Sequence, residues 1–222
     1  MTLSPLPRHF ATCLALAVAL AGAVAVTTAA AAPEAAFDSA FQTFNAASAG
    51  DEAAIDKAYD AFDALLKAEP ANPVLMAYTG ASLSMKANTT MLPWKKMSYA
   101  DDGMGLIDKA LAMLTPANDA PMQHGTPGSL EVKFVAANTF LAVPGFMNRG
   151  ARGAKLLNEV VTSPLLAGSP PGFKGAVWLR AAALAASEKR NDDARRYLNE
   201  VIAGGAPKQA EAAKAKLKDL PQ

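Results

Sequence analysis

Apolar side chains recur every three or four residues along most of the chain, the spacing of one face of an α-helix. The first such stretch predicts a helix from Glu34 to about Ser48, where Gly50 interrupts the pattern. Asp51 is a residue type that caps helices, so a second helix is expected directly after it. Prolines at 70 and 73 then end this first helix pair. The two apolar faces comprise Phe37, Ala40, Phe41 and Phe44, then Ile55, Ala58, Tyr59, Phe62, Leu65 and Leu66.

The second pair is expected to begin at Pro73, since proline is favoured in the first turn of a helix. Its first helix runs through Leu83, and residues 88–94 are irregular. A long helix is predicted from about Lys95 to Leu114. Residues 115–128 contain three prolines and two glycines, a composition typical of a loop.

Two further pairs and a last helix follow. The third pair covers Ser129–Ala142 and Pro144–Thr162, and the fourth covers Gly172–Ser187 and Asn191–Ala203, with Asn191 or Asp192 expected as its cap. The last helix, Pro207–Leu220, has lysines near its end, where cations favour the helix dipole. We therefore predict an all-α fold: an αα-hairpin repeat array of about four helix pairs plus a C-terminal capping helix.

Two short phrases recur at the ends of second helices. Pro-Ala-Asn occurs at 70–72 and 116–118, which is 46 residues apart, and Leu-Asn-Glu-Val occurs at 157–160 and 198–201, which is 41 apart. Self-similarity at such periods is typical of stacked helix pairs. The unequal separations indicate that the middle of the array is stretched, by extra residues at 84–99 and 115–128.

The first 32 residues have the order of a secretory signal peptide. A short basic start precedes an apolar stretch from Phe10 to Val26, and a small-residue run leads to an expected cut within Ala29–Ala32. An uncleaved anchor is the alternative, but the stretch is shorter than the ~20 residues that span a bilayer comfortably. Cys13, the only cysteine, begins the stretch, so it does not fit a lipidated mature N-terminus. We expect a periplasmic domain of residues 33–222 that makes no stable membrane insertion.

The composition argues against several classes of function. Removal of the leader leaves no cysteine, hence no disulfide and no thiolate nucleophile. Lysine and arginine number 21 in the full chain against 20 aspartate and glutamate residues. That balance argues against nucleic acid or a membrane surface as a partner, because both attract a basic excess. No cofactor motif such as a P-loop or a dinucleotide fingerprint is present, so no cofactor is expected.

At this point the residues resemble tetratricopeptide repeats. Small residues at Ala46, Gly80 and Ala182 would let the two helices of a pair touch, while Phe62 and Leu198 would fill the seam with the next pair. The middle repeats are longer than the family's 34 residues, which leaves other αα-hairpin arrays open. The matching positions are Trp178, Ala182, Ala194, Leu198 and Pro207; Ala46, Ala58, Phe62 and Pro70; and Gly80, Ala110 and Pro116.

The segment from Ala81 to Leu111 also resembles a group of exported bacterial repeat proteins, largely uncharacterised. Some members of that group are encoded beside transporter genes. The resemblance implies association with a transporter and no particular activity.

Few residues in the sequence could carry chemistry. His124 is the one histidine after residue 32, it lies in the proline-rich loop, and no nucleophile motif surrounds a serine. We expect a solvated loop histidine without a carboxylate and a hydroxyl beside it in a cleft. Methionines gather between 76 and 122, and Met122 with His124 could bind Cu(I). Core packing and an adaptable apolar surface are the alternatives for the methionines.

Candidate partner-binding residues are aromatic and cationic. Trp94, Lys95, Lys96 and Tyr99 share the start of the long helix, where an aromatic ring beside cations can hold a peptide or an anionic group. Arg149 and Arg152 form a basic stripe on a later helix. A buried Trp94 and solvated cations are the alternative.

We therefore expect a non-catalytic envelope protein that binds a peptide or a protein partner. A small-molecule or Cu(I) site in the methionine-rich centre is the second hypothesis. A hydrolase that uses His124 is the third.

Overall fold

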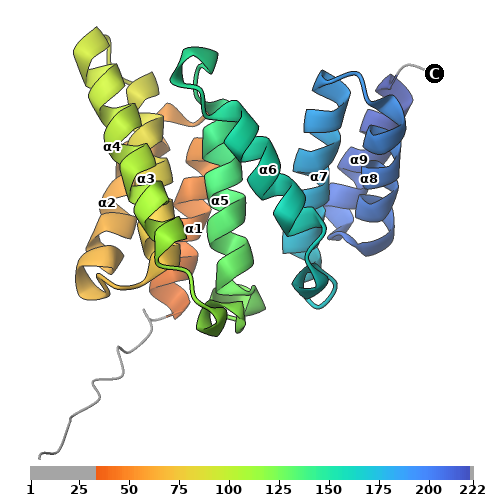
Figure 1. Cartoon of the computed structure of the whole chain (residues 1–222), viewed down its shortest axis with the longest axis horizontal. Helices are drawn as coiled ribbons and strands as arrows, with labels where there is room; N and C mark the ends of the chain where they lie inside the picture. Colours follow the sequence, from red (N-terminus) through yellow and green to blue (C-terminus); the bar gives the residue numbers. More distant parts are fainter. Residues whose placement is uncertain (1–33, 221–222) are drawn as a thin grey trace, which may run out of the picture. The chain divides into compact units, whose positions relative to one another are not determined.

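The computed structural model describes residues 34–220, so the leader predicted at 1–32 lies outside the described residues. Within them the fold is all-α, and an isolated bridge between Pro121 and Pro127 is the only β-type pairing. Figure 1 shows the helices in chain order. They are α1 (Glu34–Ser48), α2 (Glu52–Ala68), α3 (Pro73–Met85), α4 (Pro93–Ala112), α5 (Gly128–Ala142), α6 (Gly150–Val161), α7 (Pro171–Ser187), α8 (Asn191–Gly204) and α9 (Pro207–Asp219).

Helices that follow each other in the sequence pack together, so the chain forms an array of helix pairs (Figure 1). The α3–α4, α7–α8 and α5–α6 pairs pack most extensively, and α3 also contacts α5. The α6–α7 packing is much less extensive. This arrangement is the predicted helical array with a last helix, α9, packed on α8 and α7.

Most helix boundaries follow the sequence signals. The Asp51 side chain accepts a hydrogen bond from the backbone N–H of Ala53 at 3.0 Å and so caps α2. Asn72 caps α3 in the same way, with Pro73 as the first helical residue. α4 begins at Pro93, two residues before the predicted start at Lys95, because proline fits the first turn of a helix.

Two boundary predictions were wrong. α6 begins at Gly150 and not at Pro144, because residues 145–147 form a 3₁₀ turn that ends with Asn148 in the left-handed region (φ 54°). At the start of α8, neither Asn191 nor Asp192 is the cap: Arg190 occupies that position without a side-chain cap, and Asn191 is already helical. Lys189, at φ 60°, has turned the chain sharply just before this point.

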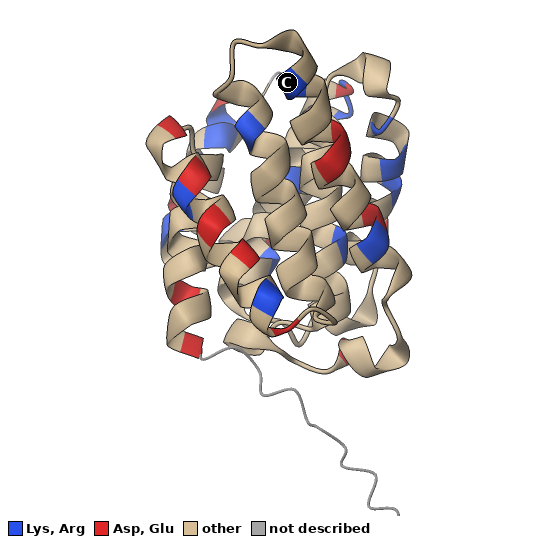
Figure 2. Cartoon of the chain, turned by 90° about the vertical axis from the view of Figure 1, so that its left-hand side faces the viewer, with Lys and Arg blue, Asp and Glu red and all other residues tan. Residues whose placement is uncertain are grey.

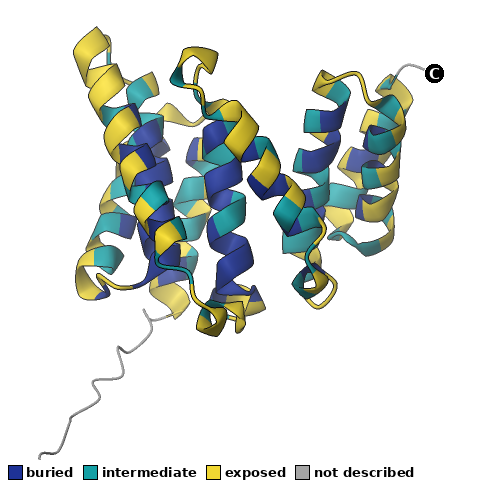
Figure 3. Ribbon diagram, in the orientation of Figure 1, coloured by how far each residue is buried: buried dark blue, intermediate teal, exposed yellow. Residues whose placement is uncertain are grey.

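The core differs between the two ends of the described chain, and Figure 3 shows the buried residues on the inner faces. Between α1, α2 and α3 lie stacked and edge-on rings, with Phe62 and Tyr78 centroids 4.7 Å apart. As expected, Phe62 fills the seam with the next pair. The fully buried members of the cluster of α7, α8 and α9 are smaller, Ala182, Leu198, Val201 and Ala213, and half-buried side chains that include Trp178 and Tyr197 pack against them.

The closest approach of two helices lies between α3 and α4. A Cβ added to Gly80 would meet the Gly103 carbonyl oxygen at 2.6 Å. Only two glycines permit this backbone contact, which confirms the small-residue role expected for Gly80. No helix among residues 34–220 is both long enough and apolar enough to cross a membrane.

Candidate functional site

A groove lies where α6 and α7 pack loosely, and α8 forms its other wall. It consists of two neighbouring hollows that share Val161 and Tyr197. The smaller, of about 110 Å³, has Leu157 on α6 and Leu184 on α7 at its apolar base. The larger, of about 290 Å³, has Trp178 at its base. Each is at or below the lower end of roughly 300–1,000 Å³ for small-molecule pockets, so each suits one side chain better than a cofactor.

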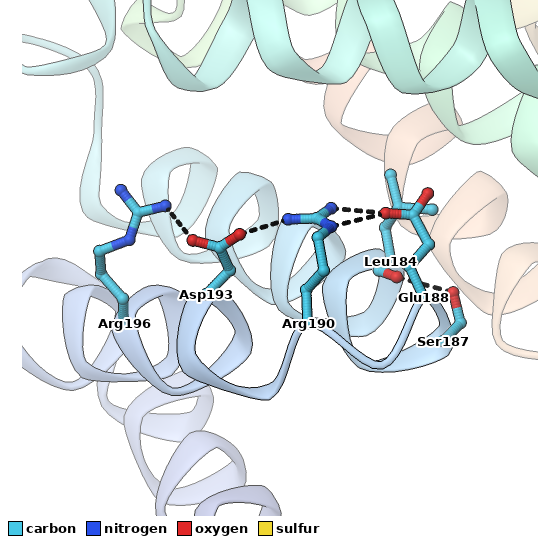
Figure 4. Close-up of polar contacts among 6 residues, drawn as sticks. All are labelled: Leu184, Ser187, Glu188, Arg190, Asp193 and Arg196. Atoms are coloured by element: carbon cyan, nitrogen blue, oxygen red, sulfur yellow. Dashed lines mark hydrogen bonds and ion pairs between the residues drawn. The ribbon is translucent and has the colours of Figure 1, made fainter.

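A chain of alternating charges fixes the polar rim of this groove (Figure 4). Arg190 donates to Glu188 Oε2 through Nε at 2.9 Å and through Nη2 at 2.6 Å, and its Nη1 donates to Asp193 at 2.5 Å. The other oxygen of Asp193 accepts from Arg196 at 2.8 Å. The hydrogen bonds from the two arginines lower the pKa of the Asp193 carboxyl. The rim is therefore ionised and oriented.

Arg196 also covers the aromatic ring at the centre of the groove. Its guanidinium carbon lies 4.7 Å from the centroid of the Tyr197 ring. Since both guanidinium groups of the rim, Arg190 and Arg196, are already paired with carboxylates, the groove carries no large excess of positive charge. A ligand would meet open hollows whose exposed lining is at least as polar as it is apolar.

The predicted partner-binding residues at the start of α4 are on the surface. Trp94 is 67% exposed. Lys95 and Lys96 are exposed, and among the described residues neither has a carboxylate partner. Tyr99 is half-buried, and the Lys86 ammonium lies 5.8 Å from the centroid of its ring. Trp94 is therefore not a core anchor.

Arg149 and Arg152 join helices instead of forming a free basic stripe. Arg149 donates to Asp108 Oδ2 on α4 at 3.0 Å, and Arg152 donates to the other oxygen of the same carboxylate. Both guanidinium groups lie over the Phe140 ring, at 5.3 and 5.2 Å. Asp108 follows Trp94 by 14 residues of helix, about 21 Å at 1.5 Å per residue. The structure therefore does not bring these arginines to the Trp94 end of α4.

His124 is less free than a solvated loop histidine. It sits at φ 56° in the loop between α4 and α5, and its Nε2 contacts the Asp38 carboxylate of α1. The imidazole packs on Phe37 and Phe41, with ring centroids 5.3 and 5.2 Å apart. A carboxylate is thus within reach, but among the described hydrogen bonds no hydroxyl reaches the imidazole. This geometry pins the loop to α1.

A buried acid lies near His124. The Tyr78 hydroxyl donates to Glu131 Oε1 at 2.8 Å, while Glu131 Oε2 is buried without a hydrogen-bond partner. Burial raises the pKa of the Glu131 carboxyl to about 7, although the Tyr78 hydrogen bond and the His124 charge act in the opposite direction. Burial, followed by the charge of Glu131, raises the pKa of Tyr78 well above its usual value. The pair joins α3 to α5 inside the core.

The methionines divide between core and surface. Met76 and Met104 are buried, whereas Met91 and Met97 are exposed. Met122 packs against Gly128, and within residues 34–220 no cluster of three His, Cys, Asp or Glu side chains could hold a metal ion. Cu(I) binding by Met122 and His124 stays a prediction.

The groove itself was missed from the sequence, although a signal for its walls was present. The repeated Leu-Asn-Glu-Val phrase supplies Leu157 and Asn158 on α6, and its second copy supplies Glu200 on α8. A repeat marks equivalent positions in two helix pairs, but it does not show that α6 and α7 pack loosely between them. Comparisons with known protein families, curated proteins and solved structures find no match to this chain.

Proposed function

We propose that this protein is an exported, non-catalytic binding protein of the cell envelope, and that the groove between α6 and α8 binds a segment of a partner protein. The observation that carries this proposal is the pair of hollows sharing Val161 and Tyr197. Peptide recognition commonly places alternate or periodic side chains in adjacent apolar pockets. Two hollows of side-chain size fit that mode better than they fit one small molecule.

The rim supports the same function. Arg196, Asn158 and Glu200 offer donors and acceptors beside the apolar bases, as a peptide backbone requires. The leader at residues 1–32 supports export, and tetratricopeptide-like pairing supports a binding role for an αα-hairpin array. A transporter-associated partner is consistent with the resemblance of residues 81–111.

The test blocks the hollows without touching the core. Ala154→Phe fills the smaller hollow and Ala167→Phe the larger one, whereas Ala151→Phe makes the same change at an exposed position of α6 that lines neither hollow. Peptides selected from a random library on the wild-type protein are titrated against each variant. We expect the two groove variants to bind at least about tenfold more weakly, which corresponds to roughly 1.4 kcal/mol.

Two results would contradict the proposal. One is the failure of repeated selections to enrich any peptide. The other is an equal loss of affinity in Ala151→Phe, which would place the bound peptide outside the groove. Thermal unfolding of all three variants confirms that each remains folded during the titrations.

A further inference from the structure

The large apolar side chains on the surface are concentrated at two turns. Among the described residues, the exposed large hydrophobic side chains are Met91, Leu92, Trp94, Met97 and Phe146. The first four belong to the α3–α4 turn and the start of α4, and Phe146 belongs to the α5–α6 turn. Both turns lie at the same end of the helix pairs, at the top of Figure 1. We call the four residues at and just before the start of α4, Met91, Leu92, Trp94 and Met97, the apolar tip.

The apolar tip is convex. Residues 91–98 are all exposed, with Met91 at 89% and Trp94 at 67%, and the upper end of α4 has the colour of exposed residues in Figure 3. Neither hollow of the groove includes a residue of the tip. A folded protein partner usually binds at a cleft or a flat face. A protruding helix end is better suited to insert into a deformable surface such as a lipid bilayer.

The sequence up to the first turn of α4 is basic, and the first acidic residues on that helix are Asp101 and Asp102. Residues 70–100 contain Lys86, Lys95 and Lys96, and residues 132–158 contain Lys133, Arg149, Arg152 and Lys155, while neither segment contains aspartate or glutamate. Ser98 donates to the Asp102 carboxylate at 3.0 Å, so the positive charge of this region is confined to the first turn of α4. Figure 2 shows where the charged residues lie along the helices.

Some of these cations are neutralised from neighbouring helices and some are not. Lys86 pairs with Asp56, Lys133 with Glu159, and both arginines with Asp108. Among the described residues, Lys95, Lys96 and Lys155 have no carboxylate partner. Lys95 and Lys96 directly follow Trp94, so the free positive charge lies beside the exposed indole.

We propose that the apolar tip docks this protein onto an anionic lipid bilayer, with Trp94, Met91 and Met97 entering the interface and Lys95 and Lys96 contacting the headgroups. Apolar side chains with flanking lysines bind at the boundary between the headgroups and the acyl chains of a bilayer. Each lysine near an anionic surface adds to the attraction. A second copy of the chain is a poorer occupant, since it would place like charges opposite each other. The proposal is independent of the groove and its ligand.

This proposal revises what the overall charge suggested. A balanced net charge predicts no attraction to membranes, but the attraction acts over about one Debye length, roughly 8–10 Å, and depends on the charges near the contact. Two free lysines beside an exposed tryptophan are enough for a weak, reversible contact. The protein would touch the bilayer surface without spanning it.

The test measures the fluorescence emission of Trp94 in the full chain. Emission of the wild type minus that of Trp94→Phe isolates Trp94 from Trp178, the other tryptophan. Vesicles of 1:1 phosphatidylcholine and phosphatidylglycerol should shift the Trp94 emission to the blue, and brominated lipid should quench it. Vesicles of phosphatidylcholine alone should have a much weaker effect, and 0.5 M salt should reverse the binding. The leader is common to all variants, so differences between them report the tip.

Charge reversal provides the matched comparison. Lys95→Glu/Lys96→Glu should weaken the lipid affinity, measured by Trp94 quenching, on the order of 30-fold or more. Lys109→Glu/Lys208→Glu makes the same change of charge at exposed positions away from the tip and should change it less than about threefold. Equal effects of the two pairs, or an unmoved Trp94 emission with anionic vesicles, would overturn the proposal.

Two further measurements would detect a different occupant of the apolar tip. A blue shift that grows with protein concentration in the absence of lipid would identify a second copy of the chain and overturn lipid docking. A photo-crosslinker at position 94 that attaches to a protein and not to lipid, in envelope membranes, would identify a protein partner and overturn it as well.

Discussion

The N-terminal helices α1–α5 and the C-terminal helices α7–α9 solve the same packing problem differently. Gly80 and Gly103 bring the backbones of α3 and α4 into contact, so nothing at that crossing can move aside. Gly175 of α7 instead faces chiefly the side-chain amide of Gln209 on α9, with the Gly205 Cα farther off, 3.2 Å from the place where a Cβ on Gly175 would lie. That amide accepts a hydrogen bond from Ala206 N–H at 3.1 Å and donates one to the Gly172 carbonyl at 2.9 Å.

The comparison shows that glycine in a helix does not have one meaning. At the first crossing it permits a rigid backbone contact, and at the second it makes room for a flexible side chain. The N-terminal region also buries an acid, Glu131, between α3 and α5, whereas the fully buried members of the C-terminal cluster are alanine, valine and leucine. The groove lies between the two regions, where α6 packs only loosely on α7.

The largest expected effect is at the α3–α4 crossing. Gly103→Ala would place its Cβ against the Gly80 carbonyl oxygen and 2.7 Å from the Ser84 backbone nitrogen, so the helices must separate. We expect a loss of about 3 kcal/mol or more in the free energy of unfolding, measured by urea denaturation. The control, Gly105→Ala on the same helix, meets nothing within 4 Å.

Gly105→Ala should stabilise the protein by roughly 0.5–1 kcal/mol, because alanine favours a helix over glycine. If both alanine variants were equally stable, the tight crossing would not exist.

The second prediction concerns the buried acid. The Glu131 carboxyl has its pKa raised to about 7, above its ordinary value of 4.5. Its contribution to stability is therefore fully present below pH 4.5, falls as the pH rises and is lost above about 7. Since Glu131→Gln stays neutral, its stability relative to the wild type should increase by about 3 kcal/mol across this window. Urea denaturation at pH 4.5 and pH 8 measures the difference.

Glu200→Gln removes an exposed carboxyl and serves as the matched control. Its difference from the wild type should change by less than about 0.5 kcal/mol over the same pH range. A flat difference for Glu131→Gln as well would show that Glu131 is solvated in the native protein.

The smallest effect is expected at the C-terminal crossing. Gly175→Ala displaces the Gln209 amide and loses its two hydrogen bonds, at a cost of about 1 kcal/mol. In a Gln209→Ala background the Gly175→Ala penalty should become smaller, although the Gly205 Cα stays 3.2 Å from the added Cβ, and a double-mutant cycle of unfolding free energies measures this coupling. Additive effects would mean that the Gly205 backbone, and not the Gln209 amide, opposes the added Cβ.

Local signals in the sequence predicted the elements well. Proline at 73, aspartate at 51 and glycine at 50 act on their immediate neighbours, so their effects can be inferred without tertiary structure. The start of α6 was placed too early because Pro144 looks like a first-turn proline. The actual turn depends on Asn148 adopting a left-handed conformation. Asparagine tolerates this conformation, but its presence in the sequence does not predict it.

Contacts between distant residues could not be inferred in the same way. Arg149 and Arg152 have the spacing of a free basic stripe, but Asp108 on another helix accepts hydrogen bonds from both. His124 was expected in solvent, and Asp38 lies 86 residues before it in the sequence. The groove depends on how loosely α6 and α7 pack, a property of two surfaces that no single stretch of sequence contains.

The contact of His124 with α1 makes the two ends of the array differ in how easily they detach. In arrays whose helices pack mainly on their sequence neighbours, the terminal helices can detach first. α1 has contacts beyond its sequence neighbours, because His124 of the loop between α4 and α5 touches Asp38, Phe37 and Phe41. α9 packs on the helices that precede it, α7 and α8. We therefore expect α9 to detach before α1 during unfolding, because His124 from the middle of the chain adds contacts that stabilise α1.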